Sequence, residues 1–356
     1  MNEKKFLEID GSLGEGGGAI LRLSAAFSVL YNIPIRIKNI RANRPKPGLR
    51  MQHLLGLKLI ADLTGSILSK CQVGSTELSF SPNNNLKKRE IDIHIPTAAS
   101  IGLLLQPIQI ACLGFKDDTE IAISINGGAT FGKWAPSINY LEQITFPIFK
   151  KSGLSIEINT QKHGFYPKGG AKVYCSIKLP KSELNPLNIT EIGEIQSIRG
   201  EIIVTSHLKQ SKRSIPLRIK NSITSELKNY FDGEIEIKER WVDSLSPGVG
   251  LCLWTRSNKG ALISSGTLLG ERNLSSERLS KIAVNRLLKY LKKDIPVDNY
   301  LSDQLVPLLS YIKKPSTIKV LEITNHTKTN LEIFSKFNKR SYEIKKVENA
   351  FLINFF

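Results

Sequence analysis

The chain has 356 residues, 41% of them hydrophobic, and this length suggests about two domains or one domain with a large insertion. The hydrophobic share is typical of folded globular proteins and excludes a disordered polar protein. The sequence contains 50 Lys and Arg residues against 32 Asp and Glu residues, a net charge of +18 at pH 7. Such a surplus favours a polyanionic partner, which could be nucleic acid, a nucleotide or an anionic membrane surface.

The sequence argues against membrane insertion and secretion. The most apolar segment, Ile101–Phe115, contains Gln106, Pro107 and Gln109, so it falls short of the roughly 18 uninterrupted apolar residues of a membrane span. The first residues include no apolar core of a signal peptide. Four widely separated cysteines match neither a zinc motif nor a disulfide scaffold: Cys71, Cys112, Cys175 and Cys252. We expect reduced thiols in a cytoplasmic protein that has no membrane partner.

Short β-branched runs alternate with helical patterns, which predicts an α/β fold with paired strands. In the first half, strands are expected at Phe6–Ile9, Ile33–Ile40, Glu77–Phe80, Ile91–Ile95, Glu120–Ile125, Leu154–Ile158 and Ala171–Ile177. Helices are expected at Ala19–Tyr31, Leu49–Gly65, Ala98–Leu113 and Pro136–Lys151. No tandem repeat is visible in the sequence.

The second half contains a segment that looks like an inserted small domain. A polar stretch, Pro180–Glu194, resembles a linker, and the segment after it has its own strands and helix. These are expected at Ile198–Thr205, Ser214–Phe231, Glu234–Trp241 and Gly250–Arg256. The chain then continues with Ser275–Lys293, Asp298–Ile312, Thr317–Ile323, a short helix around Asn330–Phe337 and a closing strand at Ala350–Phe356. We predict a large domain of residues 1–184 and 278–356, with a small α/β domain inserted at 185–277.

A glycine-rich loop, Gly14–Ala19, follows the first strand and opens the first helix. Its backbone N–H groups could bind a phosphate at the positive end of the helix. The pattern also imitates a dinucleotide fingerprint, which requires an acidic residue about 20 positions further on. Arg36 and Lys38 stand in that region instead, so an NADP site stays open, as does a plain flexible turn.

One stretch of the chain is basic without any acidic residue. Between Glu15 and Asp62 there is no Asp or Glu, whereas basic residues accumulate at Arg22, Arg36, Lys38, Arg41, Arg44, Lys46, Arg50 and Lys58. Pro45 and Pro47 stiffen the loop that carries two of them, which would hold these side chains in fixed directions, as phosphate recognition requires. A solvated basic face is the alternative, but the complete lack of acids favours an anion site.

Two histidines stand out by position. His326 follows a strand and precedes a helix, the place where α/β proteins put reactive side chains. A metal ligand, a nucleophile and a capped loop residue are equally compatible with the residues alone. His53, beside Gln52 on the helix behind the proline loop, could hydrogen-bond a nucleotide or a phosphate, or simply lie at the surface.

Five motifs together resemble the signatures of the RNA 3′-terminal phosphate cyclase family. They are Ile9–Gly18 (IDGSLGEGGG) with Arg22, Ile40–Leu49 (IRANRPKPGL) with Gln52 and His53, His163–Gly170 (HGFYPKGG), Tyr300–Gln304 (YLSDQ) and Thr324–Asn330 (TNHTKTN). The resemblance covers almost the whole chain. It implies a large domain of repeated α/β units, each a small sheet backed by two helices, interrupted by a smaller α/β domain.

The resemblance implies an enzyme that uses ATP to convert an RNA 3′-terminal phosphate to a 2′,3′-cyclic phosphate. The family forms a covalent histidinyl-AMP and then an RNA adenylate, and His326 matches its nucleophile. Relatives that serve ribosome assembly without catalysis lack this histidine. A non-catalytic RNA-binding assembly factor on the same scaffold is nevertheless the alternative that the sequence leaves open. A homodimer is one assembly that it also leaves open.

The resemblance also assigns roles to individual positions. Residues similar to the family's nucleotide site are Gln106, Tyr300, Leu301, Ser302, Asp303 and Gln304. Residues similar to those near the reacting phosphates and the RNA end are Arg22, Arg41, Arg44 and Gln52. Glu15 resembles the acidic contact for Mg²⁺ or Mn²⁺. One departure is Gly127–Thr130 (GGAT), where relatives commonly read Gly-Gly-Thr-Asp.

Overall fold

The computed structural model describes residues 5–14, 16–115, 119–209 and 214–356. Their strands form four four-stranded sheets. Three of these sheets are built on one plan, in which strand, helix, strand, helix and a final hairpin succeed one another along the chain. In each, the first strand is parallel to the second, and the fourth strand lies between the second and the third. The predicted repeated α/β units are thus present in the fold.

The first unit carries the glycine-rich loop and the proline loop. Its elements are β1 (Leu7–Asp10), α1 (Gly18–Tyr31), β2 (Ile35–Lys38), α2 (Met51–Thr64), β3 (Ile67–Leu68) and β4 (Leu78–Ser81). The β1–α1 connection holds the glycines, and the β2–α2 connection holds Arg41–Gly48. Both connections leave the same ends of two neighbouring parallel strands, so they lie next to each other.

The second unit repeats the plan with a distorted second helix. Its elements are β5 (Glu90–Ser100), α3 (Ile101–Ala111), β6 (Glu120–Ala129), α4 (Ile138–Tyr140), α5 (Phe146–Ser152), β7 (Ser155–Lys162) and β8 (Lys172–Lys178). A short 3-10 turn, Cys112–Gly114, follows α3. The helix predicted at Pro136–Lys151 is divided, because a π-helical turn, Leu141–Thr145, separates α4 from α5.

The third unit is interrupted within its first strand. Its elements are β9 (Asn188–Ile189), α8 (Asn299–Tyr311), β14 (Ser316–Val320), α9 (Asn325–Phe337), β15 (Tyr342–Val347) and β16 (Ala350–Phe355). β9 pairs with β14 at Thr317 and Ile318, and Val297 forms a further parallel bridge to Val320. The chain therefore leaves this sheet after β9 and returns to it at Val297.

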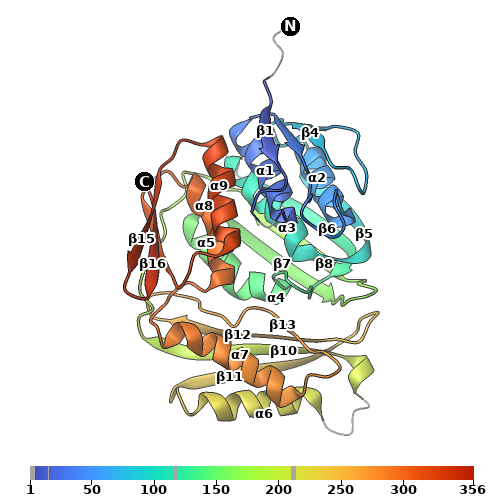
Figure 1. Cartoon of the computed structure of the whole chain (residues 1–356). Coiled ribbons are helices and arrows are strands. Elements are labelled where there is room, and N and C mark those ends of the chain that lie inside the picture. The colour runs from blue at the N-terminus through green and yellow to red at the C-terminus, as the bar shows by residue number, and fades with distance from the viewer. Residues whose placement is uncertain (1–4, 15, 116–118, 210–213) are drawn as a thin grey trace.

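The intervening segment has its own sheet and its own core. It contains β10 (Ile195–Thr205), α6 (Ile215–Leu227), β11 (Glu234–Val242), β12 (Val249–Ser257), β13 (Leu268–Leu269) and α7 (Ser276–Leu291). Figure 1 shows these elements as the lower body, below α4 and α5. A separate cluster of buried residues runs from Ile192 to Ile295 and is joined by Leu321 and Ala350 of the third unit. We propose that the inserted domain spans about 190–297, because β9 pairs with β14 and α7 lies on α6.

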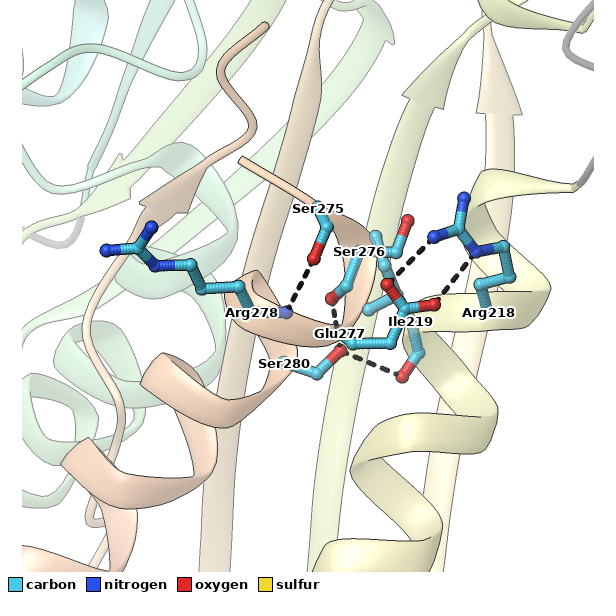
Figure 2. A network of polar contacts seen from close by, with 7 residues as sticks. All are labelled: Arg218, Ile219, Ser275, Ser276, Glu277, Arg278 and Ser280. Carbon is cyan, nitrogen blue, oxygen red and sulfur yellow. Dashed lines mark hydrogen bonds and ion pairs between the residues drawn. The ribbon is translucent and has the colours of Figure 1, made fainter. Parts of the chain in front are cut away.

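Polar contacts attach α7 to α6 (Figure 2). The guanidinium of Arg218 donates to both carboxylate oxygens of Glu277, at 2.9 and 2.8 Å. The hydroxyl of Ser280 donates to the carbonyl oxygens of Ser276 and Ile219, the latter on α6. The large domain was expected to resume at 278. On the basis of these contacts we propose that α7 belongs to the insert.

Helices make most of the contacts between the three units. α1 packs against α3 and α9, and α2 packs against α3. The ring of Phe27 on α1 lies 6.2 Å from Phe334 and 5.7 Å from Phe337 on α9. This packing fixes the start of α9 relative to the start of α1. Among the described residues, no helix has both the length and the apolar character that a membrane crossing requires.

Candidate active site

His326 lies in the first turn of α9, and its residue is exposed. Thr324 is the N-cap, and its hydroxyl accepts a hydrogen bond from the N–H of Thr327 at 2.9 Å. The predicted helix start near Asn330 was therefore wrong, because the capping threonine adds a turn ahead of the apolar pattern. The correction places His326 at the positive end of a helix, where backbone N–H groups lack helical acceptors.

Asp303 on α8 fixes this first turn. One carboxylate oxygen accepts hydrogen bonds from the hydroxyls of Thr324 at 2.6 Å and Thr327 at 2.8 Å. The carbonyl oxygen of Asp303 also accepts from the side-chain amide of Asn330 at 2.9 Å. The residue that the resemblance assigned to the nucleotide site thus holds the turn that carries His326.

The neighbours of Asp303 on α8 face different surroundings. The side chain of Leu301 is fully buried in the main core, and the Ser302 hydroxyl bonds the carbonyl of Asn299 and the hydroxyl of Thr327. Gln304 is buried, whereas Tyr300 is 42% exposed. Side-chain contact with a nucleotide is therefore available to Tyr300, and Leu301 could contribute only through its backbone.

A buried carboxyl anchors the start of α8 to the second unit and to the insert. Asp298, the N-cap of α8, accepts hydrogen bonds from the N–H of Leu301, the N–H and hydroxyl of Ser264, and the hydroxyl of Tyr140. Burial raises the pKa of Asp298 to about 6, against the opposing effect of these donors. The ring of Tyr140 lies 6.2 Å from that of Tyr300, so the residue that donates to Asp298 also packs against Tyr300.

Arg22 is a buried cation whose partner is an amide. Its Nε donates to Oε1 of Gln106 on α3 at 3.0 Å, and the Arg22 and Gln106 residues are 9% and 7% exposed. Burial alone lowers the pKa of Arg22 to about 10. Within the described residues, no carboxylate pairs with this guanidinium. An uncompensated buried charge is costly, and an anionic ligand would relieve that cost.

His53 lies beside Arg22 as a neutral imidazole. Its Nδ1 accepts a hydrogen bond from the backbone N–H of Arg50 at 3.2 Å. Burial, together with Arg22, Arg41 and Arg50, lowers the pKa of His53 to about 3. The other nitrogen of the neutral ring, Nε2, then carries the proton and can donate to a ligand. The Gln52 side-chain nitrogen, 3.5 Å away, is itself a donor and cannot accept this proton. His53 had been open to either role, and its burial excludes simple placement at the surface.

The glycine-rich loop brings the first turns of three helices together. A Cβ on Gly18, at the start of α1, would collide with Nε2 of His53 on α2 and lie 2.8 Å from Nη1 of Arg22. A Cβ on Gly14 would collide with the hydroxyl of Thr329 on α9. Because Thr329 is three residues after His326, the two share a face of α9. The N-terminal ends of α1, α2 and α9 therefore converge around this loop.

The proline loop, Arg41–Gly48, packs against the glycine-rich loop where the three helices meet. The side-chain amide of Asn43 donates to the carbonyl of Ser12 at 3.2 Å, and a Cβ on Gly17 would lie 3.5 Å from Nη2 of Arg44. Arg41 adopts a left-handed conformation with a φ of 55°, and burial plus the charges of Arg44 and Arg50 lower its pKa. Gathering these cations at helix N-termini creates a site suited to phosphate groups.

The structure thus brings together most residues that the sequence singled out. Around His53 and the glycine-rich loop lie Arg22, Gln106, Gln52, Arg41 and Arg44. Asp303 holds the turn that carries His326, and Tyr300 and Gln304 lie on the same helix as Asp303. Sequence reasoning missed Thr324, which caps the helix, and Thr329, which touches the glycine loop. The hydroxyl ahead of an apolar helical pattern was the available signal for Thr324.

The metal assignment to Glu15 lies outside the described residues. Among the residues that the structure describes, no group of three His, Cys, Asp or Glu side chains converges. Mg²⁺ is often held by one or two carboxylates together with the phosphates of a substrate, and the assignment of Glu15 to such an ion stays a prediction.

The departure at Gly127–Thr130 makes a contact within the protein. The hydroxyl of Thr130 lies 3.0 Å from Nδ1 of His163 and 3.3 Å from the carbonyl oxygen of Gly164. Burial lowers the pKa of His163 to about 4, followed by the charge of Arg240. His163 therefore braces the turn it opens, and Thr130 takes part in that bracing.

Comparison with known proteins gives consistent results. A family model described as RNA 3′-terminal phosphate cyclase matches residues 13–344. A protein of that name from Thermococcus onnurineus (strain NA1) is 37% identical over 340 residues, which cover 96% of each chain. The same name belongs to a Pyrococcus furiosus protein, 37% identical over 95% of this chain and 94% of its own. A Methanosarcina barkeri protein, also so named, is 35% identical over 98% of this chain and 99% of its own.

Proposed function

Since the chain belongs to the RNA 3′-terminal phosphate cyclase family, we propose that it uses ATP to convert an RNA 3′-terminal phosphate to a 2′,3′-cyclic phosphate. AMP and pyrophosphate are the other products. The observation that supports this most directly is the contact of Gly14 with Thr329. Through it, the face of α9 that bears His326 meets the loop beside the buried guanidinium of Arg22.

In the first step, an imidazole nitrogen of His326 attacks the α-phosphorus of ATP. The new P–N bond forms as the bond to the pyrophosphate oxygen breaks. A neutral imidazole needs no separate base for this attack, and the phosphoramidate it forms is a reactive donor for the next transfer. The backbone N–H groups at the start of α9 can stabilise negative charge on the phosphoryl oxygens.

In the second step, an oxygen of the RNA 3′-phosphate attacks the AMP phosphorus and releases His326. The neighbouring 2′-hydroxyl then attacks the activated 3′-phosphorus, loses its proton, and expels AMP as the ring closes. Arg22, Arg41, Arg44 and Gln52 would bind the terminal phosphate. A forked guanidinium suits a doubly charged phosphate, and the buried position of Arg22 fixes one such fork.

The nucleotide would lie between α3 and α8. Tyr300 offers a partly exposed ring, Gln304 and Gln106 offer amides, and Asp303 holds the turn that carries the nucleophile. Leu301 and Ser302, which are buried on α8, would hold these nucleotide-contacting residues in place. The proposed reaction takes place in the cytoplasm, where the cysteines, free in the structure, would stay reduced.

Glu15 would hold Mg²⁺ or Mn²⁺, whose charge offsets that of the triphosphate as pyrophosphate leaves. Glu15→Gln should raise the metal concentration needed for half-maximal adenylation and leave affinity for RNA unchanged. Asp62→Asn, an exposed acid-to-amide change on α2, is the matched control. An equal loss of RNA affinity would place Glu15 at the RNA end instead.

Incubation with α-labelled ATP and metal tests the enzyme proposal. The protein should retain acid-labile label, and a 3′-phosphorylated RNA should become resistant to phosphatase. A non-catalytic assembly factor would retain no label. The relatives above carry the enzyme's name, so that alternative is not favoured.

A further inference from the structure

Trp134 is an exposed aromatic residue in an unfavourable backbone conformation. It is 91% exposed and has a φ of 57°. Bulky residues rarely adopt the left-handed region, and such outliers concentrate at functional sites. The ammonium of Lys133 lies 5.1 Å from the Trp134 ring and 3.2 Å from a carboxylate oxygen of Glu271. The Trp134 side chain is thus almost fully exposed on a backbone that adopts a costly conformation.

A second exposed ring lies on the adjoining turn. Tyr166 is 79% exposed and belongs to the turn between β7 and β8. The rings of Phe131 and Phe165 stack with centroids 5.2 Å apart and an interplanar angle of 4°. The N–H of Thr130 donates to the carbonyl of Gly164 at 3.0 Å. These contacts fix the turn that carries Tyr166 against the loop that carries Trp134.

The same loop leads directly to the proposed nucleotide site. The N–H of Ser137 donates to the hydroxyl of Thr267 at 3.0 Å, next to Gly266, where a Cβ would collide with the Tyr300 ring. Tyr140, three residues further, packs against Tyr300. A continuous series of protein contacts therefore connects the proposed nucleotide site at Tyr300 with the loop of Trp134 and, through it, with the turn of Tyr166.

Charge along this path is suited to a polyanion. Lys133, which pairs with Glu271, adjoins Trp134, and Lys168 lies two residues after Tyr166; both lysines are exposed. Exposed aromatic rings combined with cationic side chains are the usual means by which proteins bind single-stranded nucleic acid, because bases stack on the rings while the cations face the backbone. Neither ring contributes to the hydrophobic core, so core packing does not account for them.

We propose that Trp134 and Tyr166 form a stacking platform for bases of single-stranded RNA just upstream of the reacting 3′ end. The inference rests on the proposed function, since it takes RNA as the substrate. It adds that the enzyme binds unpaired bases as well as the terminal phosphate. Recognition by stacking tolerates any base, so the platform would favour unpaired ends without choosing a sequence.

Binding without turnover provides the test. A fluorescent single-stranded RNA ending in a 3′-phosphate is titrated with the full chain in the absence of ATP, and anisotropy gives the affinity. Trp134→Ala and Tyr166→Ala should each weaken binding about fivefold or more, whereas Trp134→Phe should retain most of it. Tyr230→Ala is the matched control, because that ring is 54% exposed and lies 4.4 Å from the Lys292 ammonium, yet it follows α6 on the insert.

RNAs with a single abasic nucleotide near the 3′ end identify the stacked base. At one position, removal of the base should weaken binding to the wild-type chain but cause no further loss with Trp134→Ala. The proposal is overturned if both alanine variants bind RNA as tightly as the Tyr230→Ala control, or if they weaken affinity for ATP instead. Failure of the proposed function would look different, since the wild-type chain would then form no labelled adenylate at all.

Discussion

The carboxylate of Asp303 accepts a hydrogen bond of 2.6 Å from the hydroxyl of Thr324, the residue that caps the helix bearing His326. The turn that carries His326, the proposed nucleophile, is therefore held by a cap and by a carboxylate on another helix. Thr324→Ala should lower stability by about 0.5–2 kcal/mol through loss of the cap and slow adenylation as well. Thr324→Ser should preserve both, as measured by thermal unfolding and labelling rate.

His326→Ala should abolish adenylation and leave the melting temperature unchanged. The residue is exposed in the first turn of α9, so truncation removes little packing. His94→Ala, an exposed histidine on β5, is the control and should label normally. Label on His326→Ala at the normal rate would mean that another residue is the nucleophile.

Gly18→Ala and Gly17→Ala should behave differently although they are neighbours. A Cβ at residue 18 would collide with His53 and press on Arg22, whereas a Cβ at residue 17 meets only Arg44 Nη2 at an ordinary 3.5 Å. Gly18→Ala should therefore impair RNA-phosphate and ATP binding by tenfold or more, about 1.4 kcal/mol. Gly17→Ala should remain close to wild type. Equal behaviour of the two variants would argue against a tight cluster at His53.

Glu142, on the π-helical turn, should make stability depend on pH. Burial, and next the charge of Glu201, raise its pKa to about 7, while Arg240 opposes the shift. The folded chain then binds a proton more tightly than the unfolded chain, so stability should fall as pH rises from about 4.5 to about 7. Glu142→Gln should remove that slope and add about 1–3 kcal/mol at pH 8. Urea unfolding across this pH range is the measurement, and an unchanged slope would contradict it.

The sequence predicted the long elements well and missed the short ones. The helix at 18–31 and the strand at 249–257 carry clear apolar patterns. Strands of two residues, such as β3, β9 and β13, are too short to have a period and exist only through their neighbours. Without β9, the polar stretch after Pro180 looked like a linker, and the common plan of the three units was hidden.

The sequence predicted which residues belong to the candidate site, but it did not predict how they pair or which of them are protonated. Arg22 and Gln106 are 84 positions apart, and no local pattern reports that one donates to the other inside the protein. The neutral state of His53 likewise follows from burial and from arginines on other segments. Residue types in a sequence name the candidates, whereas protonation and pairing depend on distances that only the folded chain defines.

The chain leaves the third sheet after β9 and returns at Val297 along the same edge of β14. This arrangement bears on how the insert could be removed or replaced by engineering. Ile189 lies opposite Ile318 and Val297 lies opposite Val320, so the two ends of the excursion are two positions apart along one edge of the sheet. A linker of about one residue in extended conformation would span that gap. Excision of the insert would leave this sheet edge continuous in a chain of three uninterrupted units. It would also remove Ser264, whose N–H and hydroxyl donate to the buried Asp298 carboxylate, so the start of α8 would lose one of its anchors. The same junction offers a natural place at which to graft a foreign domain.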